Sequence, residues 1–222
     1  MNVELIDHMG SDLSVVNAAR VSFDKESSWE TIPFSGPTEG VLQDKDIKLI
    51  KYLAKHNHWT PFGHGSAQFR IKAPIFVARQ LMKHQVGLVW NEVSRRYIKT
   101  EPEFWSPDYW RQSAENVKQG SSEDATPSQN IVDHMYIDAT RHCLDAYKAM
   151  LDIGVCPEQA RTVLPQSMLT EWYWSGTLMA FARIYKLRCS KDAQVETSSV
   201  VKPIGDHMEK LFPESWSALC GS

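Results

Sequence analysis

The stretch that decides the fold is SAQFRIKAPIFVARQLMKH, residues 66–84, because two different periodicities meet within it. In its first half, Ala67, Phe69, Ile71 and Ala73 alternate with polar residues, which predicts a strand with one buried face. The second half opens on a proline, which suits the first turn of a helix. We therefore expect a strand that leads directly into a helix ending near residue 84.

The expected helix carries an unusual set of polar side chains. Arg79 and Lys83 are four residues apart, as are Gln80 and His84, so all four lie on adjoining parts of one surface. A solvated helix face normally mixes acids with its cations, and this face has none. The pattern favours an anionic partner, and a solvated edge of a packed helix is the alternative.

The next segment, NEVSRRY at residues 91–97, places polar groups in an apolar context just after Gly87 breaks the helix. The hydroxyl of Ser94 and the guanidinium groups of Arg95 and Arg96 form the donor set of a phosphate site.

Two further arginines, Arg161 and Arg188, fall in helical segments that are otherwise apolar. Burying an arginine is costly unless it is paired. Each of them could pair with a buried acid, whereas several such arginines in one chain favour a bound polyanion.

The remaining pattern predicts few strands and many helices. Asp44 is expected to cap a helix whose apolar residues include Ile47, Ile50 and Leu53. Further strands are expected at residues 3–6 and 168–174, further helices at 13–21, 131–153, 158–164, 178–187 and 193–211, and loops at 36–40, 56–65 and 112–129. Segregated helices and few strands predict an α+β fold, with a mixed or antiparallel sheet, flanking helices and a long central helix.

Bulk composition excludes several classes of protein. The 222 residues suit one domain spanning residues 1–222, and the net charge of -3 argues against a nucleic-acid binder. No apolar run approaches the roughly 18 residues of a membrane span, and the N-terminus lacks the apolar core of a secretory leader. The four cysteines form no CxxC pair, which indicates reduced thiols in a cytoplasmic protein.

The motifs HWTPFGH, APIFVARQLMKHQ, NEVSRRY and ARTVLP, in this order, resemble the flavin-dependent thymidylate synthases (the ThyX family), and bacteriophage-borne members in particular. The resemblance extends from about residue 3 to residue 211. The family's signature is Arg-His-Arg, seven residues and then Ser. Here it reads Lys83-His84-Gln85, eight residues and then Ser94, so both arginines are replaced and one residue is inserted.

The resemblance implies a ThyX-like fold and the reductive methylation of dUMP to dTMP. Methylenetetrahydrofolate would supply the carbon, FAD would carry the hydride, and NADPH would reduce the FAD. It also implies a homotetramer whose active sites are shared between subunits, acting in the cytoplasm (of the host, for a phage protein).

The resemblance assigns three groups of site residues. The residues expected to bind dUMP are Gln80, Lys83, Glu92, Val93, Ser94, Arg95, Arg96, Arg161 and Arg188. The residues expected to bind FAD are Thr60, Lys83, His84, Gln85, Asn91, Glu92, Thr177, Met179 and Arg183. Arg188 would be the catalytic arginine, and no metal is expected.

The residue types fit this chemistry independently of the resemblance. The C5 carbon of uracil is a poor nucleophile, and a fixed cation beside the ring makes it a better one by stabilising negative charge at N3 and O4. The chain contains no GxGxxG, so a flavin would not be held by a Rossmann turn. Lys83, His84 and Arg183 are the candidate charges in its place.

Several alternatives remain at this stage. One is a flavin- and folate-dependent enzyme that hydroxymethylates a deoxypyrimidine nucleotide, since Lys83 and Gln85 alter the expected flavin surroundings. Another is a nucleotide-binding protein that has lost its flavin. His56, His58 and His64 could bind zinc, although local packing is the preferred interpretation. Cys189 could be a nucleophile, although a packed thiol is preferred.

Overall fold

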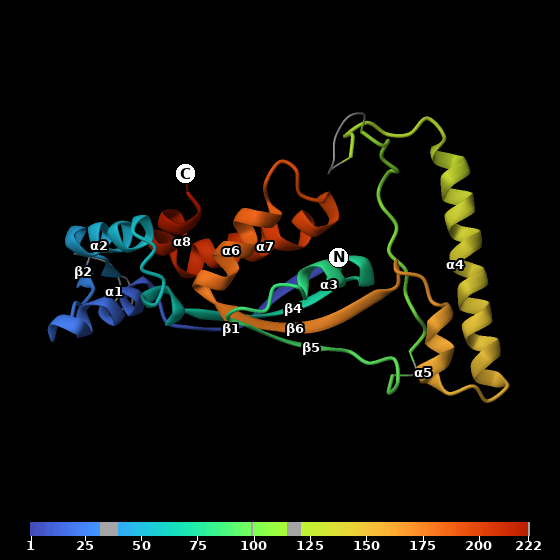
Figure 1. Cartoon of the computed structure of the whole chain (residues 1–222), viewed down its shortest axis with the longest axis horizontal. Helices are drawn as coiled ribbons and strands as arrows, with labels where there is room; N and C mark the ends of the chain where they lie inside the picture. The colour runs from blue at the N-terminus through green and yellow to red at the C-terminus, as the bar shows by residue number, and fades with distance from the viewer. Residues whose placement is uncertain (32–39, 99, 115–120, 222) are drawn as a thin grey trace.

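A computed structural model describes residues 1–31, 40–98, 100–114 and 121–221. Its centre is a four-stranded antiparallel sheet in the order β1-β4-β6-β5. The strands are β1 (Asn2–Met9), β4 (Ser66–Pro74), β5 (Leu88–Glu92) and β6 (Leu169–Thr177). The predicted α+β class with flanking helices is confirmed (Figure 1).

One face of the sheet is apolar because the apolar residues that alternate along β4 lie opposite the apolar residues that alternate along β6. Phe69 pairs with Trp174 and Ile71 with Trp172, and all four side chains are buried. The intervening residues of β4, such as Arg70, are polar and face the other side of the sheet. The strand predicted at 66–73 is therefore confirmed, together with the face that it buries.

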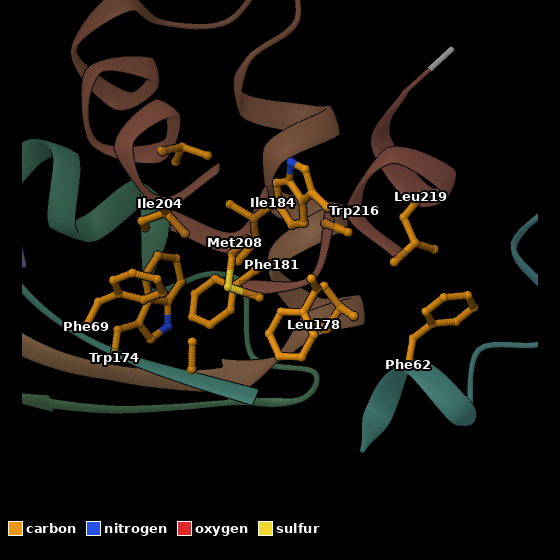
Figure 2. Packing of buried hydrophobic residues seen from close by; sticks show 14 of the residues in the cluster. Phe62, Phe69, Trp174, Leu178, Phe181, Ile184, Ile204, Met208, Trp216 and Leu219 are labelled. Atoms are coloured by element: carbon orange, nitrogen blue, oxygen red, sulfur yellow. The ribbon is translucent and has the colours of Figure 1, made fainter. Parts of the chain in front are cut away.

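Three helices cover the apolar face: α3 (Ile75–Leu81), α6 (Leu178–Arg188) and α7 (Val195–Leu211). Figure 2 shows this core, where Phe181 of α6 meets Phe69 and Trp174 edge-on at ring-centroid distances of 5.2 and 5.6 Å. Edge-to-face contacts of this kind add about 0.5–1.5 kcal/mol to the free energy of burial. The helix side of the sheet is thus a rigid support for the ends of α3 and α6.

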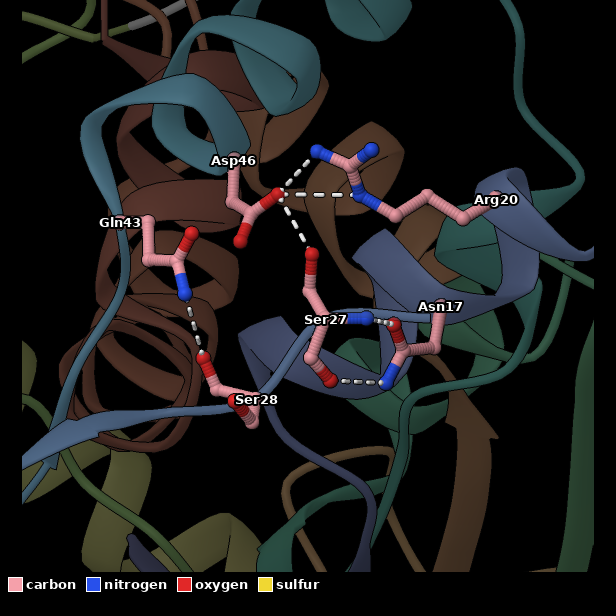
Figure 3. A network of polar contacts seen from close by, with 6 residues as sticks. All are labelled: Asn17, Arg20, Ser27, Ser28, Gln43 and Asp46. Atoms are coloured by element: carbon pink, nitrogen blue, oxygen red, sulfur yellow. Dashed lines mark hydrogen bonds and ion pairs between the residues drawn. The ribbon is translucent and has the colours of Figure 1, made fainter. Parts of the chain in front are cut away.

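The N-terminal helices lie at one end of the sheet (Figure 1). They are α1 (Asp12–Arg20), followed by the turn η1 (Val21–Phe23), and α2 (Asp44–Lys55), with a short ribbon of β2 (Glu30–Thr31) and β3 (Gly40–Val41) between them. Buried Asp46 of α2 accepts hydrogen bonds from Arg20 and Ser27, as Figure 3 shows. This network joins α1, α2 and the segment between them.

The last helix, α8 (Pro213–Cys220), is held by a residue two hundred positions earlier. Buried Asp12 accepts the backbone N–H groups of Glu214 at 2.8 Å and Ser215 at 2.9 Å. A helix start has unpaired N–H groups, and a carboxylate that accepts them acts as a cap.

Replacing Asp12 with Ala should destabilise the protein by about 2 kcal/mol, because two buried donors lose a charged acceptor. Urea denaturation measures the loss. The control is Asp44→Ala, which removes an exposed carboxylate from the first turn of α2 and should cost under about 1 kcal/mol. Equal unfolding midpoints for the two variants would show that Asp12 is not a cap.

The other end of the sheet carries α4 (Gln129–Asp152), α5 (Pro157–Ala160) and the turn η3 (Arg161–Val163). The predicted long helix is α4, but it is not central: it stands away from the sheet and packs against α5 and η3 (Figure 1). Tyr147 is its one buried residue, while Ile131 and Met135, four residues apart, are 64% and 67% exposed. The rest of the chain therefore leaves apolar side chains of α4 uncovered, as at surfaces that bind another protein.

Several sequence-based expectations were wrong in detail. Asp44 is not the cap of α2: Gln43 takes that position and Asp44 is the first helical residue. α3 ends at Leu81 rather than near residue 84, and the helix expected at 158–164 is split into α5 and η3. Five elements were not predicted from the sequence: β2, β3, β5, α8 and the 3-10 turn η2 (Pro61–Gly63), which lies inside the loop expected at 56–65.

The expected loops fall partly outside the described residues. Of the loop predicted at 36–40, residues 36–39 lie outside them, and Gly40 begins β3. Of the loop predicted at 112–129, residues 115–120 lie outside them. Its described ends are paired, with the N–H of Gln112 donated to the C=O of Asp124 at 2.9 Å. Within the parts of the chain that the structure describes, no helix is both long and apolar enough to cross a bilayer.

Candidate functional site

The turn that follows α3 packs against the start of α6. Gly87 has a φ of +77°, and a Cβ there would lie 3.1 Å from the hydroxyl of Thr177 and 3.2 Å from the Cβ of Ala180. Only glycine suits both the left-handed backbone and this close approach. Gly87 therefore sets the path from residue 82 to the first residue of β5.

Within this turn, His84 contacts Arg188 at the end of α6. The Nε–H of Arg188 donates to Nε2 of His84 at 3.0 Å. An arginine can only donate, so the imidazole must be neutral with its proton on Nδ1. Burial and the charge of Arg188 both lower the pKa of His84, which keeps the imidazole neutral.

We expect an NMR titration to place the pKa of His84 below its ordinary value of 6.5. The contact is then complete at neutral pH and is lost as the pH falls through the lowered pKa, because a protonated imidazole cannot accept the bond. Arg188→Ala should raise the pKa only part of the way back, since burial is the larger cause. Arg183→Ala, an exposed cation on the same helix, should leave it unchanged. A pKa at or above 6.5 in the unmodified protein would contradict this account.

The residue that ends β5, Glu92, is fixed by two donors. Its Oε1 accepts from the hydroxyl of Thr170 at 2.6 Å, and its Oε2 from Nε1 of Trp90 at 3.3 Å. Trp90 itself stacks on Trp172 at 4.4 Å between ring centroids. The carboxylate of Glu92 is therefore exposed but held in one orientation.

Beyond β5, three of the expected phosphate ligands meet around Glu158 of α5. Nη1 of Arg96 lies 3.4 Å from its carboxylate, and Nε of Arg161 donates to its backbone C=O at 3.3 Å. Nε of Arg96 also donates to the hydroxyl of Ser94 at 3.3 Å. Arg95 differs, because its guanidinium donates to the C=O of Thr100.

A cavity of about 520 Å³ lies beside these residues, at the end of the sheet. Of the residues expected to bind dUMP, Glu92, Val93, Arg95 and Arg161 line it. Its walls also carry Arg70, Lys72, Glu101, Glu103 and Glu171. The cavity thus has charges of both signs, with backbone from β4, β5, β6 and η3.

The structure therefore separates the expected dUMP ligands into two sets. The strand-end cluster comprises Glu92, Val93, Ser94, Arg95, Arg96 and Arg161. The helix-end cluster comprises the expected dUMP ligands Gln80, Lys83 and Arg188, together with His84, which was expected to bind FAD; these residues come from α3, the turn after it and α6. As far as the structure describes the chain, no member of the helix-end cluster lines the cavity.

The burial expected for two arginines was wrong. Arg161 is exposed, and Arg188 is half-buried with His84 as its partner rather than an acid. Ala160 beside Arg161 and Ile184 one turn before Arg188 are buried, whereas the two arginines themselves are not. Both side chains therefore remain available to an anion.

The expected flavin ligands gather mostly around the start of α6. Thr177 caps this helix by accepting the N–H of Ala180 at 3.2 Å, Met179 is half-buried, and Arg183 is exposed. The turn η2 that follows exposed Thr60 packs against α6, and Gln85 precedes Gly87 in the turn that contacts Thr177. Asn91 lies farther along β5, opposite Tyr173 of β6.

This surface fits a flavin in the chemistry of its side chains. It offers cations (Lys83 and Arg183) for a pyrophosphate, an amide at Gln85, and the half-buried thioether of Met179 against which a flat ring can pack. Lys83, Gln85, Met179 and Arg183 do not line the 520 Å³ cavity at the strand end.

The thiol beside Arg188 is not activated. Burial raises the pKa of Cys189, and burial also raises that of Cys220 to about 11. A thiol must ionise to attack, so the packed-thiol interpretation of Cys189 is supported. His56 and His58 lie against the ring of Tyr52, at centroid distances of 4.3 and 5.9 Å, and within the described residues no group of His, Cys, Asp or Glu side chains is arranged as a metal site.

The residues that orient the expected site side chains were not predicted from the sequence. Thr170 and Trp90 fix Glu92, and Glu158 lies between Arg96 and Arg161. The alternation of β6 could have shown that Thr170 shares the buried face with Trp172. Nothing in the sequence alone pairs it with a residue 78 positions away.

Comparison with known proteins decides the family. A sequence profile described as "Thymidylate synthase complementing protein" matches residues 4–214. The chain belongs to the flavin-dependent thymidylate synthase family. It is 35% identical over 216 residues to the enzyme of Thermus thermophilus, covering 97% of this chain and 74% of the relative. It is 34% identical over 218 residues to that of Thermosipho africanus, covering 97% and 89%.

A solved structure agrees with this family assignment. The UMP/dUMP methylase PolB from Streptomyces cacaoi, bound with 5-Br dUMP, has a TM-score of 0.82 and 31% sequence identity to this chain. The match covers 98% of this chain and 93% of PolB. The ThyX-like fold expected from the motifs is therefore confirmed.

Proposed function

We propose that the chain, acting as one domain over residues 1–222 in the cytoplasm, methylates dUMP to dTMP. Methylenetetrahydrofolate supplies the carbon, and FAD reduced by NADPH supplies the hydride. The observation that carries this proposal is the strand-end cluster: a hydroxyl and three guanidinium groups beside the fixed carboxylate of Glu92. This donor set suits a nucleotide monophosphate, in a chain that aligns with thymidylate synthases along 97% of its length.

In this proposal Ser94, Arg96 and Arg161 bind the phosphate of dUMP. Glu158 now contacts both arginines, and the phosphate replaces its carboxylate at Arg96. This exchange is favourable because the Arg96–Glu158 pair is long and exposed, and exposed pairs contribute about 1 kcal/mol or less. Glu92, Val93 and Arg95 line the 520 Å³ cavity together with Arg161 and contact the sugar.

Arg188 acts on the uracil ring. Its cation lies beside the ring and stabilises the negative charge that develops when C5 attacks the methylene carbon. The neutral imidazole of His84 accepts its Nε–H, so the guanidinium presents its remaining N–H groups in a fixed direction. No thiol is needed, which agrees with the raised pKa of Cys189.

The flavin is assigned to the surface at the start of α6. Thr60, Lys83, His84, Gln85, Asn91, Glu92, Thr177, Met179 and Arg183 would hold it. When bound, FAD supplies the hydride that completes the methyl group. The purified protein should therefore be yellow, with a flavin absorption band that NADPH bleaches. A colourless protein that still binds dUMP would support the alternative of a non-catalytic nucleotide-binding relative.

The two clusters belong to different subunits of a homotetramer in this proposal. The helix-end cluster does not line the described cavity of its own chain, and the exposed apolar residues of α4, Ile131 and Met135, offer a surface for a second copy. Each active site then combines the strand-end cluster of one chain with the helix-end cluster of another.

Subunit mixing tests this arrangement. Arg188→Ala and Arg161→Ala should each be nearly inactive, yet co-expressed chains should regain about a quarter of the wild-type sites by random assortment in a symmetric oligomer. The control mixes Arg188→Ala with Gln80→Ala. Both changes lie in the helix-end cluster, so this mixture should not exceed the mean activity of the two variants measured separately. If the first mixture also shows no gain over its separate variants, each chain holds a complete site.

A second candidate is hydroxymethylation of the same nucleotide. Lys83 and Gln85, where the family signature has arginines, are both exposed in the turn beside the flavin surface. At the place where hydride and water compete for the methylene intermediate, Gln85 removes a positive charge, and Lys83 keeps the charge but lacks the planar guanidinium. The likeness to a UMP/dUMP methylase also makes UMP the second nucleotide to assay.

A further inference from the structure

The first turn of α7 makes side-chain contacts with three other segments in three successive residues. Glu196 accepts from Nη2 of Arg111 at 2.5 Å, Thr197 donates to Oε1 of Gln80, and Ser198 donates to the C=O of Arg188 at 2.5 Å. A helical turn points successive side chains in different directions. Three separate segments are thus fixed to one rigid turn.

This turn is itself well anchored. Thr197 is fully buried and Ser198 is 7% exposed. The side chains of the Arg111–Glu196 pair are 18% and 13% exposed, so this pair is more protected from solvent than any other ion pair described except Arg20–Asp46. A partly buried ion pair is screened less than a surface pair. The position of the turn is therefore well determined.

The two inner contacts reach the helix-end cluster. The hydroxyl of Thr197 donates to the amide oxygen of Gln80, so the amide N–H₂ of Gln80 is directed away from α7. Without this bond the amide could rotate by half a turn and present oxygen in place of nitrogen. Ser198 fixes the backbone of the residue that ends α6, which is Arg188.

We propose that Thr197 is a positioning residue that holds the Gln80 amide with its N–H₂ group toward the uracil of dUMP. The inference rests on the proposed function. Uracil offers carbonyl oxygens as acceptors, and a donor amide recognises one of them. Thr197 contributes no contact of its own to the nucleotide. Its effect on binding therefore passes entirely through Gln80.

A double-mutant cycle on dUMP affinity, measured by isothermal titration calorimetry, tests this. Thr197→Val keeps the shape and removes the hydroxyl, and should weaken dUMP binding about 3- to 10-fold, as expected for one neutral hydrogen bond. In a Gln80→Ala background the same change should have no effect, because interacting residues are non-additive. Thr197→Ser keeps the hydroxyl and should restore wild-type affinity.

The control is Ser199→Ala in the same turn, whose hydroxyl donates to the C=O of Val195 within the helix at 2.8 Å. It should bind dUMP like the wild type. If Thr197→Val unfolds, Thr197→Ala replaces it in the cycle, with unfolding temperature recorded for every variant.

Two outcomes would overturn the inference: wild-type affinity in Thr197→Val, or the same fold loss with and without Gln80. A wild-type protein that fails to bind dUMP at all would overturn the proposed function instead.

Discussion

Replacing Arg188 with Ala is expected to lower kcat by about 100-fold or more, the size found when one donor to a developing anion is removed. The affinity for dUMP should fall much less, because the charge that Arg188 stabilises grows in the transition state. Steady-state kinetics with a separate dUMP titration measures both quantities. Flavin reduction by NADPH should largely survive, since no uracil anion forms in that step.

Two further variants sharpen this prediction. Arg188→Lys keeps the charge but loses the planar fork and the Nε–H that His84 accepts, so it too should be damaged. Cys189→Ala should remain near normal, because burial keeps this thiol protonated by raising its pKa. An active Arg188→Ala beside an inactive Cys189→Ala would refute the mechanism and indicate covalent catalysis by the thiol.

The second large effect is expected at Arg96. Its guanidinium lies between the hydroxyl of Ser94 and the carboxylate of Glu158, where the phosphate is proposed to bind. Each charge-assisted bond is worth roughly 1.5–3 kcal/mol, so Arg96→Ala should weaken dUMP binding at least about tenfold. Titration calorimetry measures the dissociation constant.

The matched control for Arg96 is Arg141→Ala, which removes an exposed arginine from α4. It should leave dUMP affinity unchanged. A second comparison uses Glu158→Gln, which removes the competing carboxylate and should keep or slightly strengthen binding. Unchanged affinity in Arg96→Ala would remove the strand-end cluster as the phosphate site.

The sequence predicted the parts of the fold in which local periodicity and burial agree. β4 and β6 alternate clearly because one face of the sheet is solvated and the other is covered by helices. β5 was missed because it is five residues long and begins directly after Gly87, so its alternation is too short to read. α8 was missed because its start is stabilised by Asp12, which no local pattern connects to it.

The candidate site, too, was predictable where local motifs define it and not where it depends on tertiary contacts. The motifs pointed to Glu92, Ser94, Arg96 and Arg161, and the structure gathers them at one end of the sheet. The split between the strand-end and helix-end clusters could not be predicted from spacing, because it depends on how β5 pairs with β6 and separates the two ends of the segment. The contacts of Thr170 with Glu92, Glu158 with Arg96, and Thr197 with Gln80 join residues at least 62 positions apart. Tertiary packing alone brings these side chains together.

The most direct test of the central claim is the mass of the nucleotide product. The pure protein is incubated with dUMP, methylenetetrahydrofolate, FAD and NADPH, and the product is analysed by mass spectrometry. Our account predicts a nucleotide heavier than dUMP by one CH₂ unit, formed in proportion to NADPH consumed and nearly absent with Arg188→Ala. A product heavier by CH₂O would mean hydroxymethylation, and unchanged dUMP under conditions where the flavin is reduced would contradict the proposed function.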